Sequence, residues 1–304
     1  MASRKEGDVH PWMKSNTMKI IDLYQRRQPI ISFEFFPPKT DRGMTGLLRT
    51  AQRLKELKPG FVSITYGAMG STRDKTLDLV HRMKHELGLE AMSHLSCVGA
   101  SAHTITSTLE TLRADGIDNI LALGGDPPKD PNFVQPSDGF THANELAAFI
   151  KRNGQFCIGG ACYPEGHIDA PSKEVDLFYC QKKVADGVDF LITQLFFDNQ
   201  DYLDFVARAR AIGIDVPIVP GIMPITNFTQ IKRFTQICGS KIPQQLERDL
   251  SPIEDDLEQV KAYGIAYATR QCRELLEAGA PGIHFYTLNG SEAVTRILAN
   301  LERG

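Results

Sequence analysis

The run ISFEFF, residues 31–36, predicts a β-strand, because it is short and rich in aromatic and β-branched residues. Seven further runs of this kind follow it along the chain. They are FVSITY (61–66), MSHLSC (92–97), NILALG (119–124), FCIGGACY (156–163), DFLITQLF (189–196), VPIVPGI (216–222) and IHFYTL (283–288). Most of the eight are apolar on both faces, which is typical of strands in a parallel sheet covered by helices.

Amphipathic segments lie between these runs and predict helices. Examples are TGLLRTAQRLKELK (45–58), DKTLDLVHRMKHEL (74–87), AHTITSTLETLRADG (102–116) and SKEVDLFYCQKKVADG (172–187). Eight strand–helix units favour a closed (β/α)8 TIM barrel over an open doubly wound sheet, which usually has about five to seven strands. We therefore expect an α/β protein with one barrel domain over residues 18–304, extra helices within residues 226–278, and a polar N-terminal extension over residues 1–17.

The overall charge of the chain indicates which kinds of partner it can bind. The net charge is −3 and the isoelectric point is near 6.3, so no strong field attracts nucleic acid or an anionic membrane. No apolar run approaches the length that crosses a bilayer, and the N-terminus lacks the apolar core of a secretion signal. Six cysteines are scattered without a C-x-x-C pair, which indicates reduced thiols. We expect a cytoplasmic protein that binds small molecules.

In a TIM barrel the active site forms where the strands end, so polar residues there are the first candidates. Glu34 lies among aromatic neighbours and shares one face of its strand with Ser32 and Phe36. If this face points inward, burial raises the pKa of Glu34 and makes it a usable general acid. The alternative is an outward glutamate paired with a helix lysine.

Asp126 follows the fourth predicted strand, directly after Gly124 and Gly125. The two glycines would allow a ligand to approach the backbone closely, and the carboxylate would then face that ligand. Alternatively, Asp126 only caps a turn before two prolines. Gln194 ends the sixth strand, where its amide could either bind a heterocycle edge or tie down a neighbouring loop.

A metal site was the other possibility at the strand ends, where His94, His167 and His284 lie. Their spacing matches no recognised zinc motif, so we expect no metal there. The pair Lys182 and Lys183 could meet a phosphate or form a solvated helix face. No G-x-G-x-x-G or G-x-x-x-x-G-K-[ST] sequence is present, which argues against the usual dinucleotide and nucleotide sites.

Eight segments together resemble the methylenetetrahydrofolate reductase family, and the likeness spans about residues 18 to 300. In order they are FEFFPPKT, FVSITYGA, SHLSCVGA, ILALGGDPP, ACYPEGH, DFLITQLFFD, PIVPGIMPI and HFYTLN. The resemblance implies a (β/α)8 barrel that binds FAD and works in two half-reactions. A reduced nicotinamide, NADH or NADPH, first reduces the flavin, and 5,10-methylenetetrahydrofolate then takes its place and is reduced to 5-methyltetrahydrofolate in one-carbon metabolism.

The resemblance also implies roles for individual residues. Glu34 matches the general acid that assists opening of the folate's one-carbon ring, and Asp126 matches a carboxylate near the flavin and the pterin. Gln194 matches a glutamine that contacts folate and nicotinamide in turn, with Thr65 near the nicotinamide path. Positions that match FAD contacts are Tyr66, Ala68, His94, Gly124, Gly125, His142, Ala143, Tyr163, His167, Asp176, Lys182 and Lys183. Gln230 and Tyr286 are candidates for the folate side.

Two positions depart from the family pattern. Many members have arginine at the positions of Gly124 and Gly290, so contacts to FAD or to the folate tail are expected to differ here. The chain ends soon after the eighth unit, so we expect a short form without the C-terminal regulatory region of longer eukaryotic relatives. Members of the family commonly self-associate, which implies a homo-oligomer.

Two other functions stay open on sequence alone. One is a flavin-binding homologue that takes its electrons from a partner protein, as the changes at Gly124 and Gly290 suggest. The other is a flavin-free barrel that transfers a pterin-linked group with a metal held by His94, His167 and Asp126.

Overall fold

The computed structural model describes residues 18–26, 28–66, 73–125 and 132–303. Its strands form one sheet of parallel neighbours in the order β7-β6-β5-β4-β3-β2-β1-β9-β8. Their bounds are β1 Ile30–Phe35, β2 Phe61–Ile64, β3 Ala91–Ser96, β4 Asn119–Leu123, β5 Cys157–Cys162, β6 Phe190–Thr193, β7 Ile218–Val219, β8 Gly221–Ile222 and β9 Gly282–Tyr286. All eight predicted strands are confirmed, because β7 and β8 both fall within the run 216–222.

The short strands β7 and β8 close the barrel. Only Pro220 separates them, and proline has no N–H to donate to a neighbouring strand. Ile218 and Val219 pair with β6, whereas Gly221 and Ile222 pair with β9 on the other side. One interrupted strand therefore joins both edges of the sheet, and the eight units of a TIM barrel result.

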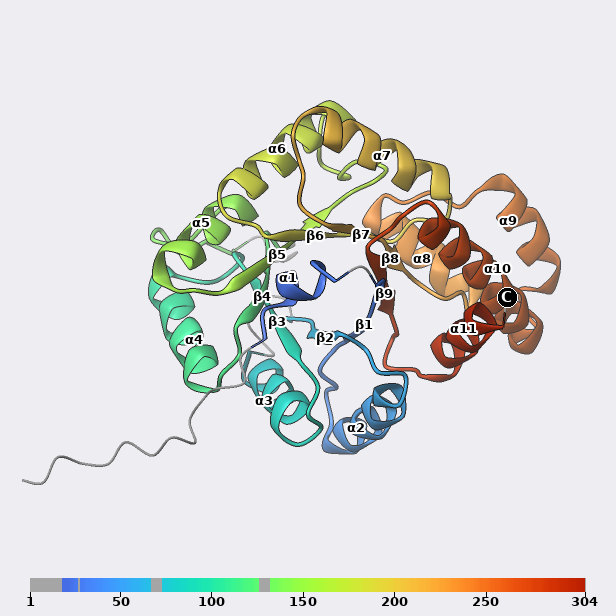
Figure 1. Ribbon diagram of the computed structural model, residues 1–304, viewed down its shortest axis with the longest axis horizontal. Coiled ribbons are helices and arrows are strands. Elements are labelled where there is room, and N and C mark those ends of the chain that lie inside the picture. The colour runs from blue at the N-terminus through green and yellow to red at the C-terminus, as the bar shows by residue number, and fades with distance from the viewer. Residues whose placement is uncertain (1–17, 27, 67–72, 126–131, 304) are drawn as a thin grey trace, which may run out of the picture.

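The helices form an outer ring around this barrel, as Figure 1 shows. They are α2 Asp41–Lys55, α3 Arg73–His85, α4 Ala102–Ala114, α5 Ala143–Asn153, α6 Lys173–Ala185, α7 Asn199–Ala211, α8 Phe228–Cys238, α9 Gln244–Leu250, α10 Leu257–Glu277 and α11 Glu292–Glu302, with a 3₁₀ turn at Ser251–Ile253. Helices α8, α9 and α10 are the extra helices expected between residues 226 and 278. The TIM-barrel prediction is therefore confirmed.

The interior of the barrel is apolar at the N-terminal ends of its strands. Phe61, Met92 and Phe190 meet there, and the short helix α1, Ile20–Leu23, packs Ile20 and Leu23 against them. Helix α1 lies across this end of the barrel in Figure 1. Hydrogen bonds with Asn119 help to hold the segment in place: the Ile20 N–H donates to Asn119 Oδ1, and Asn119 Nδ2 donates to the Met18 carbonyl. This end is filled, so a ligand must enter from the other one.

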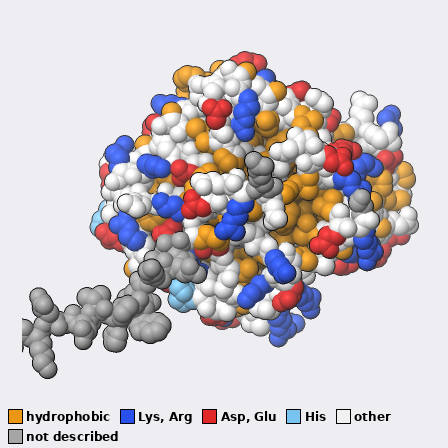
Figure 2. Space-filling model, viewed as in Figure 1, with side chains coloured by type: hydrophobic (Ala, Val, Ile, Leu, Met, Phe, Trp, Pro, Cys, Tyr) orange, Lys and Arg blue, Asp and Glu red, His pale blue; other side chains and the backbone are white. Residues whose placement is uncertain are grey.

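The distribution of charged side chains on the surface agrees with the small net charge of the chain. Figure 2, viewed as Figure 1, shows acidic and basic side chains interspersed over this face. No helix within the described residues combines the length and the hydrophobicity that crossing a membrane requires. All six cysteines are free thiols, and every one except Cys238 is fully buried. The predicted extension, residues 1–17, lies outside the described part of the chain.

Candidate active site

A pocket of about 340 Å³ opens at the C-terminal ends of the strands. Side chains and backbone from several strands and the loops after them line it, as in other TIM barrels. The lining residues are Glu34, Thr65, Tyr66, His94, Leu121, Ala122, Leu123, Gly124, Gly125, Ala143, Ala161, Tyr163, Lys183, Ile192, Gln194 and Tyr286. The lining combines aliphatic residues with polar groups, which suits a largely apolar ring system with a polar edge.

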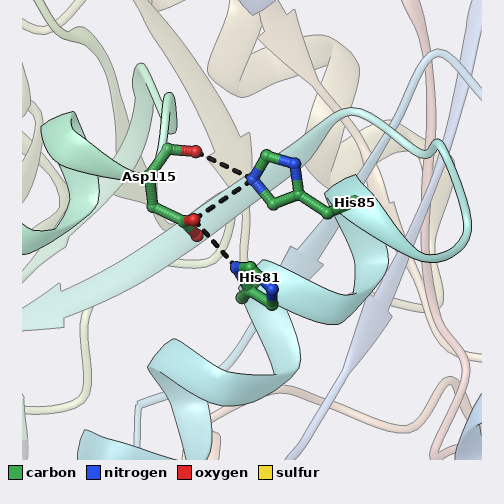
Figure 3. Close-up of side chains that lie close together, drawn as sticks. All are labelled: His81, His85 and Asp115. Atoms are coloured by element: carbon green, nitrogen blue, oxygen red, sulfur yellow. Dashed lines mark hydrogen bonds and ion pairs between the residues drawn. The ribbon is translucent and has the colours of Figure 1, made fainter.

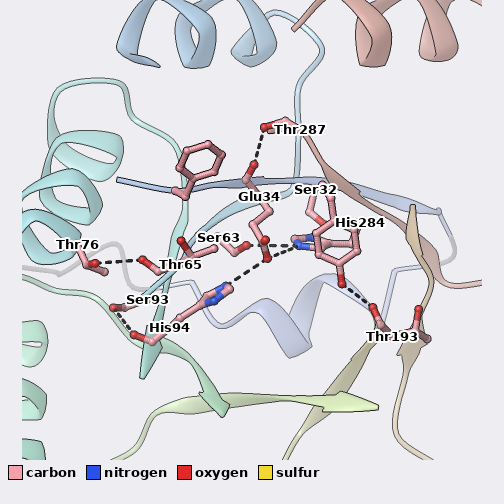
Figure 4. Close-up of polar contacts among 12 residues, drawn as sticks. Ser32, Glu34, Ser63, Thr65, Thr76, Ser93, His94, Thr193, His284 and Thr287 are labelled. Atoms are coloured by element: carbon pink, nitrogen blue, oxygen red, sulfur yellow. Dashed lines mark hydrogen bonds and ion pairs between the residues drawn. The ribbon is translucent and has the colours of Figure 1, made fainter. Parts of the chain in front are cut away.

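Glu34 projects from β1 into this pocket, between two histidines from other strands (Figure 4). Its Oε2 lies 3.6 Å from Nε2 of His94 on β3 and 3.6 Å from Nε2 of His284 on β9. The Glu34 side chain is 20% exposed, whereas His94 is 5% and His284 is 0% exposed. The inward orientation is therefore correct, and the outward glutamate considered from sequence is wrong.

Serines hold His284 in the barrel. Its Nδ1 lies 2.8 Å from Ser32 Oγ, and its Nε2 lies 3.4 Å from Ser63 Oγ. The ring also stacks on Phe61, with 6.0 Å between the centroids and 17° between the planes. The two serines and the ring of Phe61 thus fix the His284 imidazole beside Glu34.

The pKa of Glu34 differs from our expectation. Burial alone raises it, as predicted, but the hydrogen-bonding imidazole of His284 and the attraction of His94 outweigh burial and hold the pKa below its ordinary value of 4.5. The expectation of a raised pKa is wrong because the sequence did not show that two imidazoles meet this carboxylate. Glu34 is ionised at neutral pH in the ligand-free protein.

His94 has a lower pKa than a histidine on the surface. Burial lowers its pKa from 6.5 to about 4, although the nearby Glu34 opposes this change. The ring is therefore neutral at pH 7. Its Nε2 finds no hydrogen-bond partner among the described residues, and His94 lines the pocket. A buried polar atom of this kind is commonly satisfied by a ligand or a water.

Tyr286 on β9, the register partner of Glu34, and Gln194 directly after β6 also line the pocket. The Tyr286 hydroxyl donates to the Thr193 carbonyl over 2.6 Å, and burial raises its pKa well above the ordinary value. Gln194 accepts a 2.9 Å hydrogen bond from the Leu195 N–H through Oε1. Lys183 on α6 donates to the Ala161 carbonyl at the pocket wall. These contacts fix the side chains before any ligand binds.

The glycines after β4 shape the pocket in two ways. Gly125 has a φ of +82°, and a Cβ there would lie 2.0 Å from Ser96 Oγ, so a larger residue would not fit. Gly124 has open space around its missing Cβ. A side chain at position 124, such as the arginine that the resemblance leads one to expect, would therefore meet no obstacle at its Cβ.

The structure brings most of the predicted site residues together. Glu34, Thr65, Tyr66, His94, Gly124, Gly125, Ala143, Tyr163, Lys183, Gln194 and Tyr286 line one pocket. Asp126 and Ala68 lie outside the described residues. The remaining candidates, His142, His167, Asp176, Lys182 and Gln230, do not line this pocket.

Some of the residues outside the pocket lie close to it. His167 packs edge-on against Tyr163, with centroids 4.6 Å apart. Asp176 is buried near Lys183, and burial raises its pKa. His142, Lys182 and Gln230 are exposed. Of the two histidines only His94 lines this pocket, so among the described residues the pocket gives no support for the metal ligand set considered from sequence.

The sequence analysis missed the role of His284. A signal for it was present, because His284 and Tyr286 are two residues apart on one strand and so share a face. Ser32 shares the face of Glu34 in the same way. The pairing of Ser32 with His284 across β1 and β9 depends on barrel closure, which links residues 252 positions apart.

A carboxylate-centred pocket at the C-terminal mouth of a closed (β/α)8 barrel defines the class: a barrel protein with the site architecture of a small-molecule enzyme. Comparison with known proteins makes this specific. Residues 19–302 match the family model for methylenetetrahydrofolate reductase. The chain belongs to the methylenetetrahydrofolate reductase family.

Individual relatives agree. The chain is 43% identical over 300 residues to methylenetetrahydrofolate reductase (NADH) 1 of Arabidopsis thaliana, an alignment covering 93% of this chain and 51% of that protein. It is 38% identical over 262 residues to 5,10-methylenetetrahydrofolate reductase of Escherichia coli, covering 86% and 87%. The chain thus spans about half the length of the plant relatives and most of the bacterial one.

Solved structures support the fold. An uncharacterised protein from Clostridium thermocellum, which binds two copies of 5-methyl-5,6,7,8-tetrahydrofolic acid, has a TM-score of 0.64 at 18% identity, covering 93% of this chain and 96% of that one. Oxaloacetate acetylhydrolase has a TM-score of 0.51 at 11% identity, covering 95% and 84%. At these identities the likeness concerns the barrel alone.

Proposed function

We propose that this protein reduces 5,10-methylenetetrahydrofolate to 5-methyltetrahydrofolate, with bound FAD and a reduced nicotinamide as hydride donor. The observation that carries the proposal is the Glu34 carboxylate, held between His94 and His284 at the mouth of a barrel of this family. Relatives whose names specify NADH favour that donor over NADPH. We further propose a cytoplasmic homo-oligomer that binds neither nucleic acid nor membrane.

The residues of the pocket fit a flat heteroaromatic group such as the isoalloxazine of FAD. Gly124 and Gly125 present backbone without side chains, and Leu121 offers an apolar surface. The unpartnered Nε2 of His94 and the amide of Gln194 supply polar contacts for a ring edge. When bound, FAD would accept a hydride from the nicotinamide and pass a hydride to the folate.

Glu34 supplies the proton in this proposal. A general acid must carry a proton before it can donate one, yet the pKa of Glu34 is lowered in the ligand-free protein. A folate stacked in the pocket would displace water from the partly exposed carboxylate and thereby favour its neutral form. The protonated Glu34 then donates to the folate nitrogen that leaves when the one-carbon ring opens.

Other residues orient the reactants. Gln194 both donates and accepts hydrogen bonds, so it suits the pterin and the nicotinamide amide in turn. Thr65 and Tyr66, after β2, line the same pocket as Gly124 and Gly125, and we place the nicotinamide path at Thr65 and Tyr66. We also assign to FAD binding the residues Tyr163, His167, Asp176, Lys182, Lys183, His142, Ala143 and Ala68. To Asp126 we assign a role toward the flavin and the pterin, and to Gln230 and Tyr286 a role on the folate side.

The test follows the two half-reactions separately. Purified protein should show a flavin absorption spectrum, which disappears when NADH is added without oxygen. Addition of methylenetetrahydrofolate should restore the spectrum with formation of 5-methyltetrahydrofolate. Absence of flavin after reconstitution with FAD, or reduced flavin that the folate does not reoxidise, would contradict the proposal.

A second candidate is a flavin-binding homologue that receives electrons from a partner protein. The glycines at positions 124 and 290 favour it, because Gly124 lines the pocket and both positions lack the arginine of many relatives. Stopped-flow mixing with NADH and with NADPH separates the two candidates. If dithionite bleaches the flavin but neither nicotinamide does, the second candidate is correct.

A further inference from the structure

Two histidines and an aspartate converge on the outer surface, away from the pocket. His81 and His85 lie one turn apart on α3, and Asp115 caps the C-terminus of α4 beside them (Figure 3). The Asp115 Oδ1 lies 2.8 Å from His81 Nδ1 and 3.2 Å from His85 Nε2. The ligand atoms that the three side chains offer all lie within 4.8 Å of one another.

The position is at the N-terminal end of the barrel. His85 ends α3 shortly before β3 begins at Ala91, and Asp115 precedes β4, which begins at Asn119. The candidate active site lies at the opposite ends of the strands. The cluster therefore makes no contact with the reacting groups of the proposed function.

Residue type and spacing match a metal-binding arrangement. Histidines at i and i+4 on one helix face chelate zinc in known motifs, and a carboxylate commonly supplies a third ligand. Zinc–nitrogen bonds of about 2.0–2.1 Å at tetrahedral angles place neighbouring ligand atoms roughly 3.3 Å apart. The separations of 2.8 and 3.2 Å are within about half an ångström of that spacing. We propose that His81, His85 and Asp115 bind one divalent transition-metal ion such as Zn²⁺.

The hydrogen bonds now present do not oppose this assignment. His81 directs Nδ1 to the Asp115 carboxylate, and His85 directs Nε2 both to that carboxylate and, over 3.0 Å, to the Asp115 backbone carbonyl. The metal needs the lone pairs of these two nitrogens. The ring proton is then carried by the other nitrogen. Because the side chains of His81 and His85 are 51% and 44% exposed, that nitrogen can bond to water. A tautomer change thus frees both lone pairs, with loss of the hydrogen bond from His85 Nε2 to the Asp115 backbone carbonyl.

Space for the remaining ligand is also present. A pocket of about 520 Å³, lined by Asp78, His81 and Asp115 among others, opens beside the cluster. Asp78 lies one turn before His81 on α3. Water or the Asp78 carboxylate can complete a four-coordinate site.

A metal bound here would cross-link α3 to α4, which belong to consecutive strand–helix units. It binds the folded chain better than the unfolded one, so it stabilises the protein by mass action. It should leave the basal reaction unchanged, because it lies at the other end of the barrel. We infer a stabilising site, independent of the proposed function.

The experiment uses the untagged full chain, freed of metal with EDTA and then titrated with ZnCl₂ alone. Calorimetry should give one Zn²⁺ per chain, and the melting temperature should rise with Zn²⁺ concentration. His85→Ala should weaken binding by at least about tenfold, because a ligand is lost. His81→Ala should do the same, and circular dichroism checks that both variants are folded.

The matched control is His103→Ala, which removes another exposed histidine, on α4, outside the cluster. It should bind Zn²⁺ as the unchanged protein does. Co²⁺ provides a second readout, since ligation by imidazole should give visible absorption bands that His85→Ala abolishes. Failure to bind one Zn²⁺ per chain, or binding that survives both His81→Ala and His85→Ala, would overturn the proposal.

Discussion

At the residue scale, Glu34 stands in surroundings that favour its carboxylate form. His94 and His284 each lie 3.6 Å from one carboxylate oxygen, and Ser63 lies near the same imidazole as Glu34. A general acid with a lowered pKa works only if the ligand changes its surroundings. The open pocket allows this, because the Glu34 side chain is 20% exposed before a ligand arrives.

The first prediction concerns Glu34→Gln. Glutamine keeps the shape of the side chain but cannot act as an acid, so folate reduction should fall by about 10²- to 10⁴-fold. Flavin reduction by the nicotinamide needs no such proton and should change by only a few fold. Stopped-flow absorbance measures both half-reactions. Glu110→Gln, an exposed change on α4, is the control, and equal loss of both half-reactions in Glu34→Gln would refute the assigned role.

The second prediction concerns acid stability. The pKa of His94 is about 4 in the folded protein, below its ordinary 6.5. The unfolded chain therefore binds the His94 proton more readily, and stability is lost as the pH falls from about 6.5 towards 4. This loss reaches ~3 kcal/mol, at about 1.4 kcal/mol per pKa unit. Above pH 6.5 the effect is absent.

Urea unfolding between pH 7 and pH 4 tests this. His94→Gln should show a shallower decline of unfolding free energy over that window, whereas His103→Gln, at an exposed position, should follow the unchanged protein. Identical slopes for the unchanged protein and His94→Gln would show that His94 does not carry this pH dependence. The lowered pKa of Glu34 also contributes to stability, but this contribution is lost only as the pH falls below about 4.5, at the acid end of the range.

At the scale of elements, α10 contacts the barrel through a glycine. A Cβ at Gly264 would lie 1.9 Å from the Ile225 carbonyl oxygen, so the helix and the segment after β8 meet backbone to backbone. This segment holds Met223 and Ile225 in a cluster with Phe228 of α8. The close contact with α10 thus stabilises the segment that follows β7, Pro220 and β8.

The third prediction compares two glycines. Gly264→Ala should lower the free energy of unfolding by about 1–3 kcal/mol despite the better helix propensity of alanine, because the backbones must separate. Gly46→Ala, in α2, is the matched control: no atom lies within 4 Å of its added Cβ. It should stabilise by about 0.5–1 kcal/mol. Urea denaturation measures both, and stabilisation by Gly264→Ala would show that the contact is not tight.

Elements were more predictable than side-chain partnerships. Strand runs such as 31–36 and 189–196 carry a local signal of composition and length, so all eight strands were found. The helix pair His81 and His85 also carried a local signal, the i and i+4 spacing, which the sequence analysis did not use. Asp115 could not be added to it, because its approach depends on how α4 packs beside α3.

The pocket shows the same limit. Period two left the orientation of Glu34 open, and the resemblance to a family favoured the inward one. The direction of its pKa could not be predicted, because His284 comes from the far end of the chain and meets Glu34 only when β1 pairs with β9. The net effect of neighbouring charges on a pKa in a closed barrel depends on which strands lie next to each other, and the sequence alone does not show this order.

At the scale of the whole molecule, ligand and fold are linked, because the pocket is lined by elements from β1 to β9. A ligand that binds only the folded chain stabilises it by RT ln(1 + [L]/Kd), which is about 2.7 kcal/mol at a hundredfold excess over Kd. FAD that bridges these elements should therefore raise the melting temperature of flavin-free protein. Riboflavin, which lacks the diphosphate and the adenine, should raise it less.

The fourth prediction separates the two parts of the cofactor. Lys183 donates to the Ala161 carbonyl at the pocket wall, and we expect it to meet the FAD diphosphate as a compact cation. Lys183→Ala should then reduce the stabilisation by FAD while leaving that by riboflavin unchanged. Lys182→Ala, one residue away but exposed and outside the pocket lining, should have the smaller effect. Equal responses of both variants to FAD would show that Lys183 does not contact the diphosphate. The loss of a direct charge contact must weaken the binding of FAD, and the loss of an exposed lysine outside the pocket should not.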